Sequence, residues 1–113
     1  MRDFRQLKVW QKAHQLTLDI YKVTASFPCE ELYGLVSQMR RSSASIPSNI
    51  AEGCGKCGQA DLTRSIIIAA GSASELEYQL ILALDLDFLD VSAYKDLSDN
   101  VVELKKMLSA VTR

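Results

Sequence analysis

Apolar residues recur at spacings of three and four along most of the chain, and proline, glycine or acidic residues interrupt this pattern in three places. The spacing is typical of amphipathic α-helices, whereas no stretch alternates for long enough to favour a strand. The pattern predicts four helices, over 3–27, 28–52, 59–84 and 90–111, joined by short connections. Four such helices favour an all-α fold, an up-down-up-down antiparallel four-helix bundle that forms a single domain over 1–113.

The third and fourth predicted helices have the clearest core-facing seams, with the alternating four-three spacing of a left-handed bundle. The two seams consist of Leu62, Ile66, Ala69, Ala73, Leu76, Leu80 and Ala83, and of Tyr94, Leu97, Val101, Leu104, Leu108 and Val111. Asp90 or Ser92 is expected to cap the fourth helix. Ile67, Ala70, Ile81 and Leu84 extend the apolar surface of the third helix to other faces, which favours a subunit interface in addition to a core.

The first predicted helix has two neighbouring apolar stripes, so it is expected to contact more than one neighbour. One stripe is Leu7, Trp10, His14, Thr17, Tyr21 and Thr24, and the other is Val9, Ala13, Leu16, Ile20, Val23 and Phe27. Asp3 is expected to cap this helix, with Gln6 three residues later completing a capping box.

The second predicted helix begins at Pro28, presents Leu32, Leu35, Val36 and Met39 as its apolar face, and contains a second proline, Pro47. A proline inside a helix lacks the backbone donor for the carbonyl four residues earlier, here Ser43, so we expect a kink near Pro47. Neighbouring serine hydroxyls are suited to satisfy the disturbed backbone. Gly53, Gly55 and Gly58 are expected to end the helix and form the loop.

The composition fits one globular domain, with 113 residues, 48% hydrophobic residues and 24% charged residues. The longest apolar or small run, 66–73, is shorter than the roughly 20 residues of a membrane-spanning helix, and the N-terminus lacks the apolar region of a signal peptide. We therefore expect a cytoplasmic protein with no membrane contact. The net charge is −1, but it is uneven: +3 over 1–28, zero over 29–65 and −4 over 66–113. The halves could attract each other within or between subunits, or the basic part could face nucleic acid.

Charged and amide side chains suggest two kinds of site. The candidate binding residues are the basic side chains Arg2, Arg5, Lys8, Lys12, Arg40, Arg41, Lys56 and Arg64. The candidates for a structural polar cluster are Gln38, Asn49, Glu52 and Glu75. Such a cluster either satisfies the kinked helix and its neighbours or belongs to a surface on which arginines bind phosphate or an acidic protein.

No catalytic constellation is evident, so we expect no enzymatic activity, no cofactor and no resident metal. Cys54 and Cys57 form a C-x-x-C pair, but the remaining candidate ligands, Cys29 and His14, lie in other elements. The carboxylate and histidine pairs of a di-iron bundle are missing. His14 is expected in the core or at an interface, and no nucleophile elbow accompanies it.

Five motifs together resemble a known family. They are F-x-x-L-x-V-W over 4–10, Phe27-Pro28 with 31–35, Gln38–Arg41, S-I-P-S-N-I-A-E-G over 45–53, and A-x-G-S-A-x-E-L-E over 69–77. The chain is similar to the bacterial four-helix-bundle proteins related to those encoded in intervening sequences of large-subunit ribosomal RNA genes. The resemblance covers almost the full length. It implies a cytoplasmic up-down bundle that assembles as a homopentamer and has no known enzymatic activity.

The same family is similar to the accessory variability determinant of diversity-generating retroelements, a basic pentamer that contacts a reverse transcriptase and nucleic acid. This chain departs from it by being slightly acidic, and it has Cys54 and Lys56 where relatives often have an aromatic residue and an arginine. The leading hypothesis is a non-enzymatic oligomeric binding or scaffold protein whose basic surfaces contact RNA or an RNA-handling partner. The alternatives are a structural or protein-interaction module with no nucleic-acid role, favoured by a pI of about 5.8, and a metal or redox protein using the C-x-x-C.

Overall fold

The computed structural model of the chain describes residues 3–56 and 58–112, and over these residues it consists of helices without strands. A short 3-10 helix, Phe4–Gln6, precedes α1 (Lys8–Thr24), and a second one, Cys29–Glu31, precedes α2 (Leu35–Gly55). The chain continues with α3 (Gln59–Asp85) and α4 (Val91–Val111). The prediction of an all-α fold built on four long helices is confirmed.

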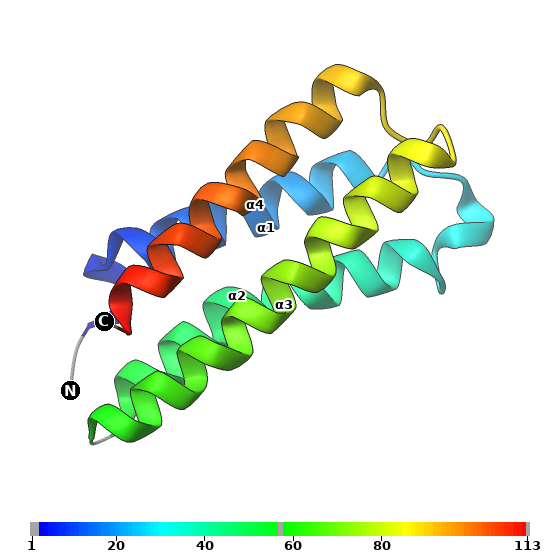
Figure 1. Cartoon of the computed structure of the whole chain (residues 1–113). Coiled ribbons are helices and arrows are strands. Elements are labelled where there is room, and N and C mark those ends of the chain that lie inside the picture. Colours follow the sequence, from blue (N-terminus) through cyan, green and yellow to red (C-terminus); the bar gives the residue numbers. More distant parts are fainter. Residues whose placement is uncertain (1–2, 57, 113) are drawn as a thin grey trace.

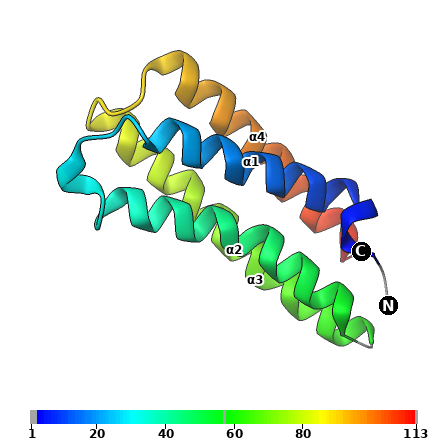
Figure 2. The ribbon, with the colours of Figure 1, turned by 180° about the vertical axis from the view of Figure 1, so that it is seen from behind.

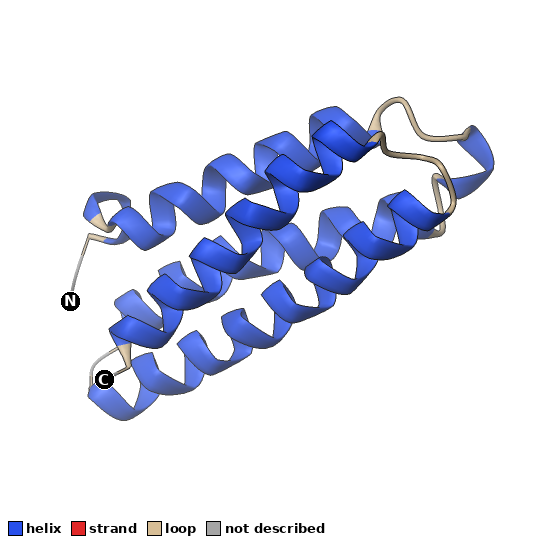
Figure 3. Ribbon diagram, turned by 45° about the horizontal axis from the view of Figure 1, so that its top comes forward, coloured by secondary structure: helices blue, strands red, loops and turns tan. Residues whose placement is uncertain are grey.

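The four helices lie side by side in an elongated body of 43 × 24 × 20 Å. The start of α1, the end of α2, the start of α3 and the end of α4 lie at one end of this body, and the α1–α2 and α3–α4 connections lie at the opposite end (Figure 1; Figure 2 from behind). Successive helices therefore run in opposite directions. Around the bundle, α1 packs on α2, α2 on α3, α3 on α4 and α4 on α1, so α1 and α3 occupy diagonal corners. Figure 3 shows the long helices side by side with short loops between them.

The core contains the seams that the sequence predicts for α3 and α4. All seven seam residues of α3 are buried, and the four central seam residues of α4 are buried as well. Tyr94 and Val111, at the two ends of the α4 seam, are half-buried. Asp90 caps α4, because its carboxylate accepts a hydrogen bond from the backbone N–H of Ala93 at 2.7 Å. Burial of each large aliphatic side chain contributes roughly 1.5–3 kcal/mol to folding.

The first helix starts later than predicted, and it buries one of its two predicted stripes more fully than the other. Asp3 caps the 3-10 turn by accepting from the backbone N–H of Arg5 at 3.1 Å, and extended backbone at Leu7 separates this turn from α1. On the stripe from Val9 to Phe27 five of the six residues are buried, whereas on the other stripe only Thr17 and Thr24 are buried. Tyr21, on the other stripe, is 46% exposed. A four-three spacing fits either stripe, so only the positions of α2 and α4 decide between them.

The start of α2 also lies later than predicted. Pro28 leads into the 3-10 helix Cys29–Glu31, and α2 begins only at Leu35, where the Glu31 carboxylate accepts from the backbone N–H of Leu35 at 3.2 Å. Leu32 consequently lies outside α2 and is 46% exposed. The expectation that Leu32 belongs to the apolar face of this helix is wrong, because the chain has not yet entered the bundle at that point.

Pro47 lies inside α2, and the helix continues through it to Gly55. The carbonyl oxygen of Ser43, which a proline at position 47 leaves without its helical donor, receives a hydrogen bond from the buried hydroxyl of Thr17 at 3.0 Å. A side chain of α1 thus replaces the backbone bond that the proline removes. The proline does not end the helix, while the kink near Pro47 stays a prediction.

Gly53 has a role other than ending the helix. It lies within α2, and a Cβ atom built on it would stand 2.8 Å from the Cβ of Ser65 and 3.2 Å from a methyl group of Leu62. A side chain at this position would collide with α3, so Gly53 sets the close approach of α2 and α3. Gly58 fulfils the predicted loop role, because it adopts a φ of 114° directly before α3, a conformation that favours glycine.

The most apolar helix is α3. By length and composition alone α3 could cross a membrane, a test that the core helices of bundles in water also pass. Only 39% of its most apolar window is buried within the chain. Much of the apolar surface of α3 therefore faces outward.

Candidate binding surfaces

The polar side chains in the middle of α2 are bonded to the neighbouring helices. The Ser42 hydroxyl, which is buried, donates to Oε1 of Gln79 on α3 at 2.6 Å. One turn further, the Ser45 and Ser72 hydroxyls are 2.8 Å apart. Among the described residues, every buried side-chain nitrogen or oxygen of the bundle has a hydrogen-bond partner. This network stabilises the packing of α2 against its neighbours.

The structure does not bring the four candidates for a structural polar cluster together. Gln38 and Glu75 are exposed, and Glu52 forms an ion pair with Lys56 one turn later at 3.0 Å. Asn49 is half-buried and donates to the carbonyl and hydroxyl of Ser45 in its own helix, at 2.8 and 3.1 Å. The residues that link α2 to α3 are instead serines and Gln79. The spacing of polar residues in the sequence does not distinguish these side chains from polar side chains at the surface.

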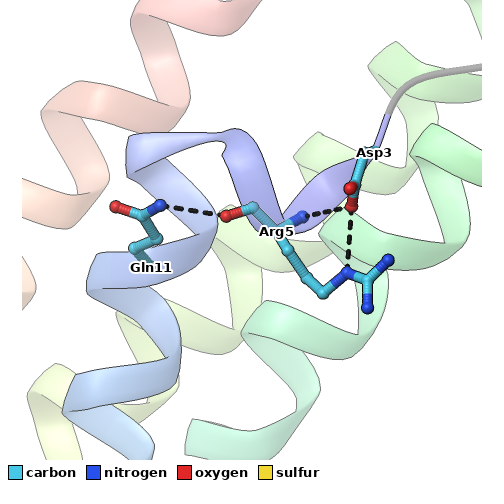
Figure 4. A network of polar contacts seen from close by, with 3 residues as sticks. All are labelled: Asp3, Arg5 and Gln11. Atoms are coloured by element: carbon cyan, nitrogen blue, oxygen red, sulfur yellow. Dashed lines mark hydrogen bonds and ion pairs between the residues drawn. The ribbon is translucent and has the colours of Figure 1, made fainter.

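Several of the candidate basic residues are paired with carboxylates of the same chain. The distances are 3.1 Å for Arg5 to Asp3, 3.1 Å for Lys12 to Glu103, 3.0 Å for Lys56 to Glu52 and 3.3 Å for Arg64 to Asp61. Figure 4 shows Arg5 held between Asp3 and the side-chain amide of Gln11, which donates to the Arg5 carbonyl. Hydrogen bonds from the side chain and backbone of Arg5 lower the pKa of the Asp3 carboxyl. These pairs reduce the positive charge available to a phosphate.

The two arginines of α2 differ in their surroundings. Arg40 is half-buried, lies 4.7 Å from the ring centre of Tyr21, and donates to the Thr24 hydroxyl at 3.0 Å and to the Tyr21 carbonyl at 3.2 Å. Arg41 is exposed and donates to the Ser37 hydroxyl at 3.3 Å. Both arginines line an open hollow with Tyr21, Leu32, Tyr33, Val36 and Ser37. Lys8 is exposed on α1, and Arg2 lies outside the described residues.

The cysteines and the histidine form no cluster within the described part of the chain. Cys54 is buried in α2 and Cys29 is exposed, while Cys57 lies outside the described residues. Over 3–56 and 58–112, no group of three His, Cys, Asp or Glu side chains is placed to hold a metal ion. His14 is exposed and stacks on Trp10 with ring centres 5.0 Å apart and an angle of 10° between the rings. The expected core position of His14 is therefore wrong, and its role at an interface stays a prediction.

A second heptad-like series runs along the outward side of α3, and we call Ile67, Gly71, Ser74, Tyr78 and Ile81 the α3 stripe. All five residues are exposed, with exposed fractions of 63% for Ile67, 60% for Tyr78 and 41% for Ile81. The sequence indicated this surface through Ile67 and Ile81. The regular four-three spacing that also includes Gly71 and Tyr78 was the signal for its full extent.

The sequence of the chain matches the model of a protein family, 23S rRNA-intervening sequence protein, over residues 5–110. The chain is a member of this family. The crystal structure of a protein of unknown function from the S23 ribosomal protein family of Bacteroides thetaiotaomicron is similar to this intervening-sequence family member, with a TM-score of 0.82. The two sequences are 25% identical, and the match covers 93% of this chain and 98% of that one. No curated protein matches the chain.

The family match confirms the resemblance that the five motifs carry. The name of the family refers to an intervening sequence of 23S rRNA and not to an activity. The similar crystal structure is of a protein with unknown function. Membership in the family therefore agrees with the fold of this chain but does not indicate its function.

Proposed function

We propose that this intervening-sequence family member is a non-enzymatic scaffold protein that assembles into a homo-oligomer, a pentamer as its resemblance implies, through the outward side of α3. The observation that carries the proposal is the α3 stripe. Large side chains repeat along it at the spacing of a helix–helix seam, yet Ile67, Tyr78 and Ile81 remain 63%, 60% and 41% exposed in the single chain. Exposed apolar surface of this regularity is typical of an interface.

The glycine within the stripe supports the same conclusion. A Cβ atom on Gly71 would meet no other atom within 4 Å, so packing inside the chain does not require glycine here. Glycine in the middle of a helix is unfavourable by roughly 0.5–1 kcal/mol relative to alanine. A second helix packed closely against α3 would account for glycine at this position.

The proposal is tested by the mass of the protein in solution. We expect light scattering at micromolar concentrations to give a multiple of the 12.6 kDa chain mass, five-fold for a pentamer. Ile67→Lys should reduce it toward the mass of one chain, because the ammonium group cannot be buried unpaired. Val91→Lys is the matched control, since Val91 is 71% exposed at the start of α4 and does not belong to the stripe. A monomeric wild-type protein would overturn the proposal.

A second candidate function is contact with RNA, and it is favoured by the hollow at the start of α2. Two tyrosines and two arginines line it, and aromatic rings with guanidinium groups are suited to stack on unpaired bases and bind phosphate. Arg41 and Lys8 have no carboxylate partner among the described residues. The pairing of four other cations limits this function to a small surface.

RNA contact is tested by measuring affinity for a single-stranded RNA at several salt concentrations. If the hollow binds RNA, Arg41→Ala lowers the affinity and reduces the slope of its logarithm against the logarithm of salt by about one. Arg64→Ala serves as the control, because Arg64 is already paired with Asp61. No binding at low salt, or equal slopes for wild type and Arg41→Ala, would reject this function in favour of a protein-interaction module.

A further inference from the structure

We infer that copies of this chain meet head to tail, with an aromatic stripe on α1 of one copy packed against the α3 stripe of the next. The α1 stripe consists of His14, Leu18 and Tyr21, with Trp10 at its edge. This inference rests on the proposed self-association and names the second surface that takes part in it. The partner that it commits to is a second copy of the chain.

The α1 stripe has the spacing and the exposure that a partner for the α3 stripe needs. Trp10, His14, Leu18 and Tyr21 follow one another at intervals of four, four and three residues. Leu18 is 41% exposed and Tyr21 is 46% exposed. Two helices that each present apolar residues at such intervals can interdigitate along their lengths.

The ring side chains of the α1 stripe have contacts with neighbours within the chain. His14 stacks on Trp10, and Trp10 packs edge-on against Phe4 with ring centres 5.0 Å apart. The guanidinium group of Arg40 lies over the Tyr21 ring, 4.7 Å from its centre. A surface whose aromatic side chains are held in place loses less conformational entropy on binding.

The two halves of the bundle carry opposite charges. Helices α1 and α2 together carry +3, from Lys8, Lys12, Lys22, Arg40 and Arg41 against Asp19 and Glu52. Helices α3 and α4 together carry −3, because Arg64, Lys95, Lys105 and Lys106 stand against Asp61, Glu75, Glu77, Asp85, Asp96, Asp99 and Glu103. A contact between the α1 side of one copy and the α3 side of another therefore brings unlike charges together, whereas a contact between two α3 stripes brings like charges together.

The positions of the two stripes exclude contact between them within one molecule. Helices α1 and α3 occupy diagonal corners of the bundle, and each packs on α2 and α4. Each copy therefore has two different surfaces to offer, one to each neighbour. Such a head-to-tail contact produces a closed ring when the rotation between copies closes.

The test uses two variants, each with one damaged stripe. Ile67→Lys adds positive charge to the α3 stripe, and Leu18→Glu adds negative charge to the α1 stripe. Because every head-to-tail contact needs one intact stripe of each kind, each variant alone should have the mass of a single chain by light scattering. An equimolar mixture should form complexes that contain both chains, since the α1 stripe of Ile67→Lys and the α3 stripe of Leu18→Glu are intact. His14→Glu should behave as Leu18→Glu does.

The outcomes separate this inference from the proposal on which it rests. A monomeric wild-type protein overturns both. An oligomeric wild-type protein whose mass is unchanged by both Leu18→Glu and His14→Glu overturns only the head-to-tail contact, and so does a mixture in which the two damaged variants stay apart. Circular dichroism of each variant establishes that it is folded, and Val91→Lys, which alters neither stripe, should keep the wild-type mass.

Discussion

The more polar helix α2 buries a larger share of its residues than the more apolar helix α3. Among the 21 residues of α2 are several serines and a proline, yet ten of these residues are buried. The 27 residues of α3 are more apolar, yet only nine are buried and its isoleucines at 67 and 68 face outward. Burial in this protein therefore follows from position in the bundle, and composition alone would rank the two helices wrongly.

The buried polar residues of α2 and the exposed apolar residues of α3 have different physical explanations. The buried hydroxyls of α2 are tolerated because each one finds a hydrogen-bond partner, as Ser42 does on Gln79. The outward isoleucines of α3 have no comparable compensation within the chain, and a partner would provide it. Polar burial thus reflects internal packing here, whereas the apolar exposure is the basis of the proposed association.

The largest difference in stability is expected between substitutions on the inner and outer sides of α3. Leu76, on the inner seam, is fully buried, so Leu76→Ala should lower the free energy of unfolding by about 2–5 kcal/mol through the lost contacts and the cavity. Tyr78, two residues later, is 60% exposed, and Tyr78→Ala should cost far less in a dilute, monomeric sample. Urea unfolding followed by circular dichroism measures both.

Protein concentration provides the control for this pair. The cost of Tyr78→Ala should grow as the concentration rises into the range of assembly, because binding of another copy stabilises the folded state. The cost of Leu76→Ala should stay nearly constant. Equal costs for both variants in the monomer would mean that the two sides of α3 do not differ as described.

The next largest change in stability is expected at two glycines, one packed against α3 and one in open space. Gly53→Ala should destabilise the protein by about 1–3 kcal/mol, because its new methyl group would collide with the Cβ of Ser65. Gly71→Ala, in open space, should stabilise the monomer by roughly 0.5–1 kcal/mol. Thermal unfolding at low concentration measures both changes. Ser65→Gly should recover part of the loss caused by Gly53→Ala, and the absence of any recovery would contradict the proposed collision.

The sequence was sufficient to predict those features of the fold that depend on residue spacing within one helix. The seams of α3 and α4 and the Asp90 cap follow from local periodicity and capping chemistry, and the structure has them as predicted. The inner stripe of α1 and the role of Gly53 depend on how helices approach one another, which spacing along one chain does not contain. The candidate polar cluster failed for the same reason, because its members share a segment of sequence without facing one another.

The smallest effect concerns the link between Pro47 and Thr17. Thr17→Val keeps the shape of the side chain but removes the hydroxyl that donates to the Ser43 carbonyl, and it should cost about 1–2 kcal/mol because a buried acceptor loses its partner. In a Pro47→Ala background, the restored backbone N–H can donate to this carbonyl, so the cost of Thr17→Val should shrink.

A double-mutant cycle on unfolding free energies measures this coupling, which should be about 0.5–1 kcal/mol. The hydroxyl also lies 2.9 Å from the carbonyl of Ala13 in its own helix, and Pro47→Ala leaves that contact unchanged, so the coupling isolates the bond to Ser43. Thr17→Ser keeps a hydroxyl at the same position and should preserve most of the coupling. Additive costs would show that α2 tolerates its proline without help from the Thr17 hydroxyl of α1.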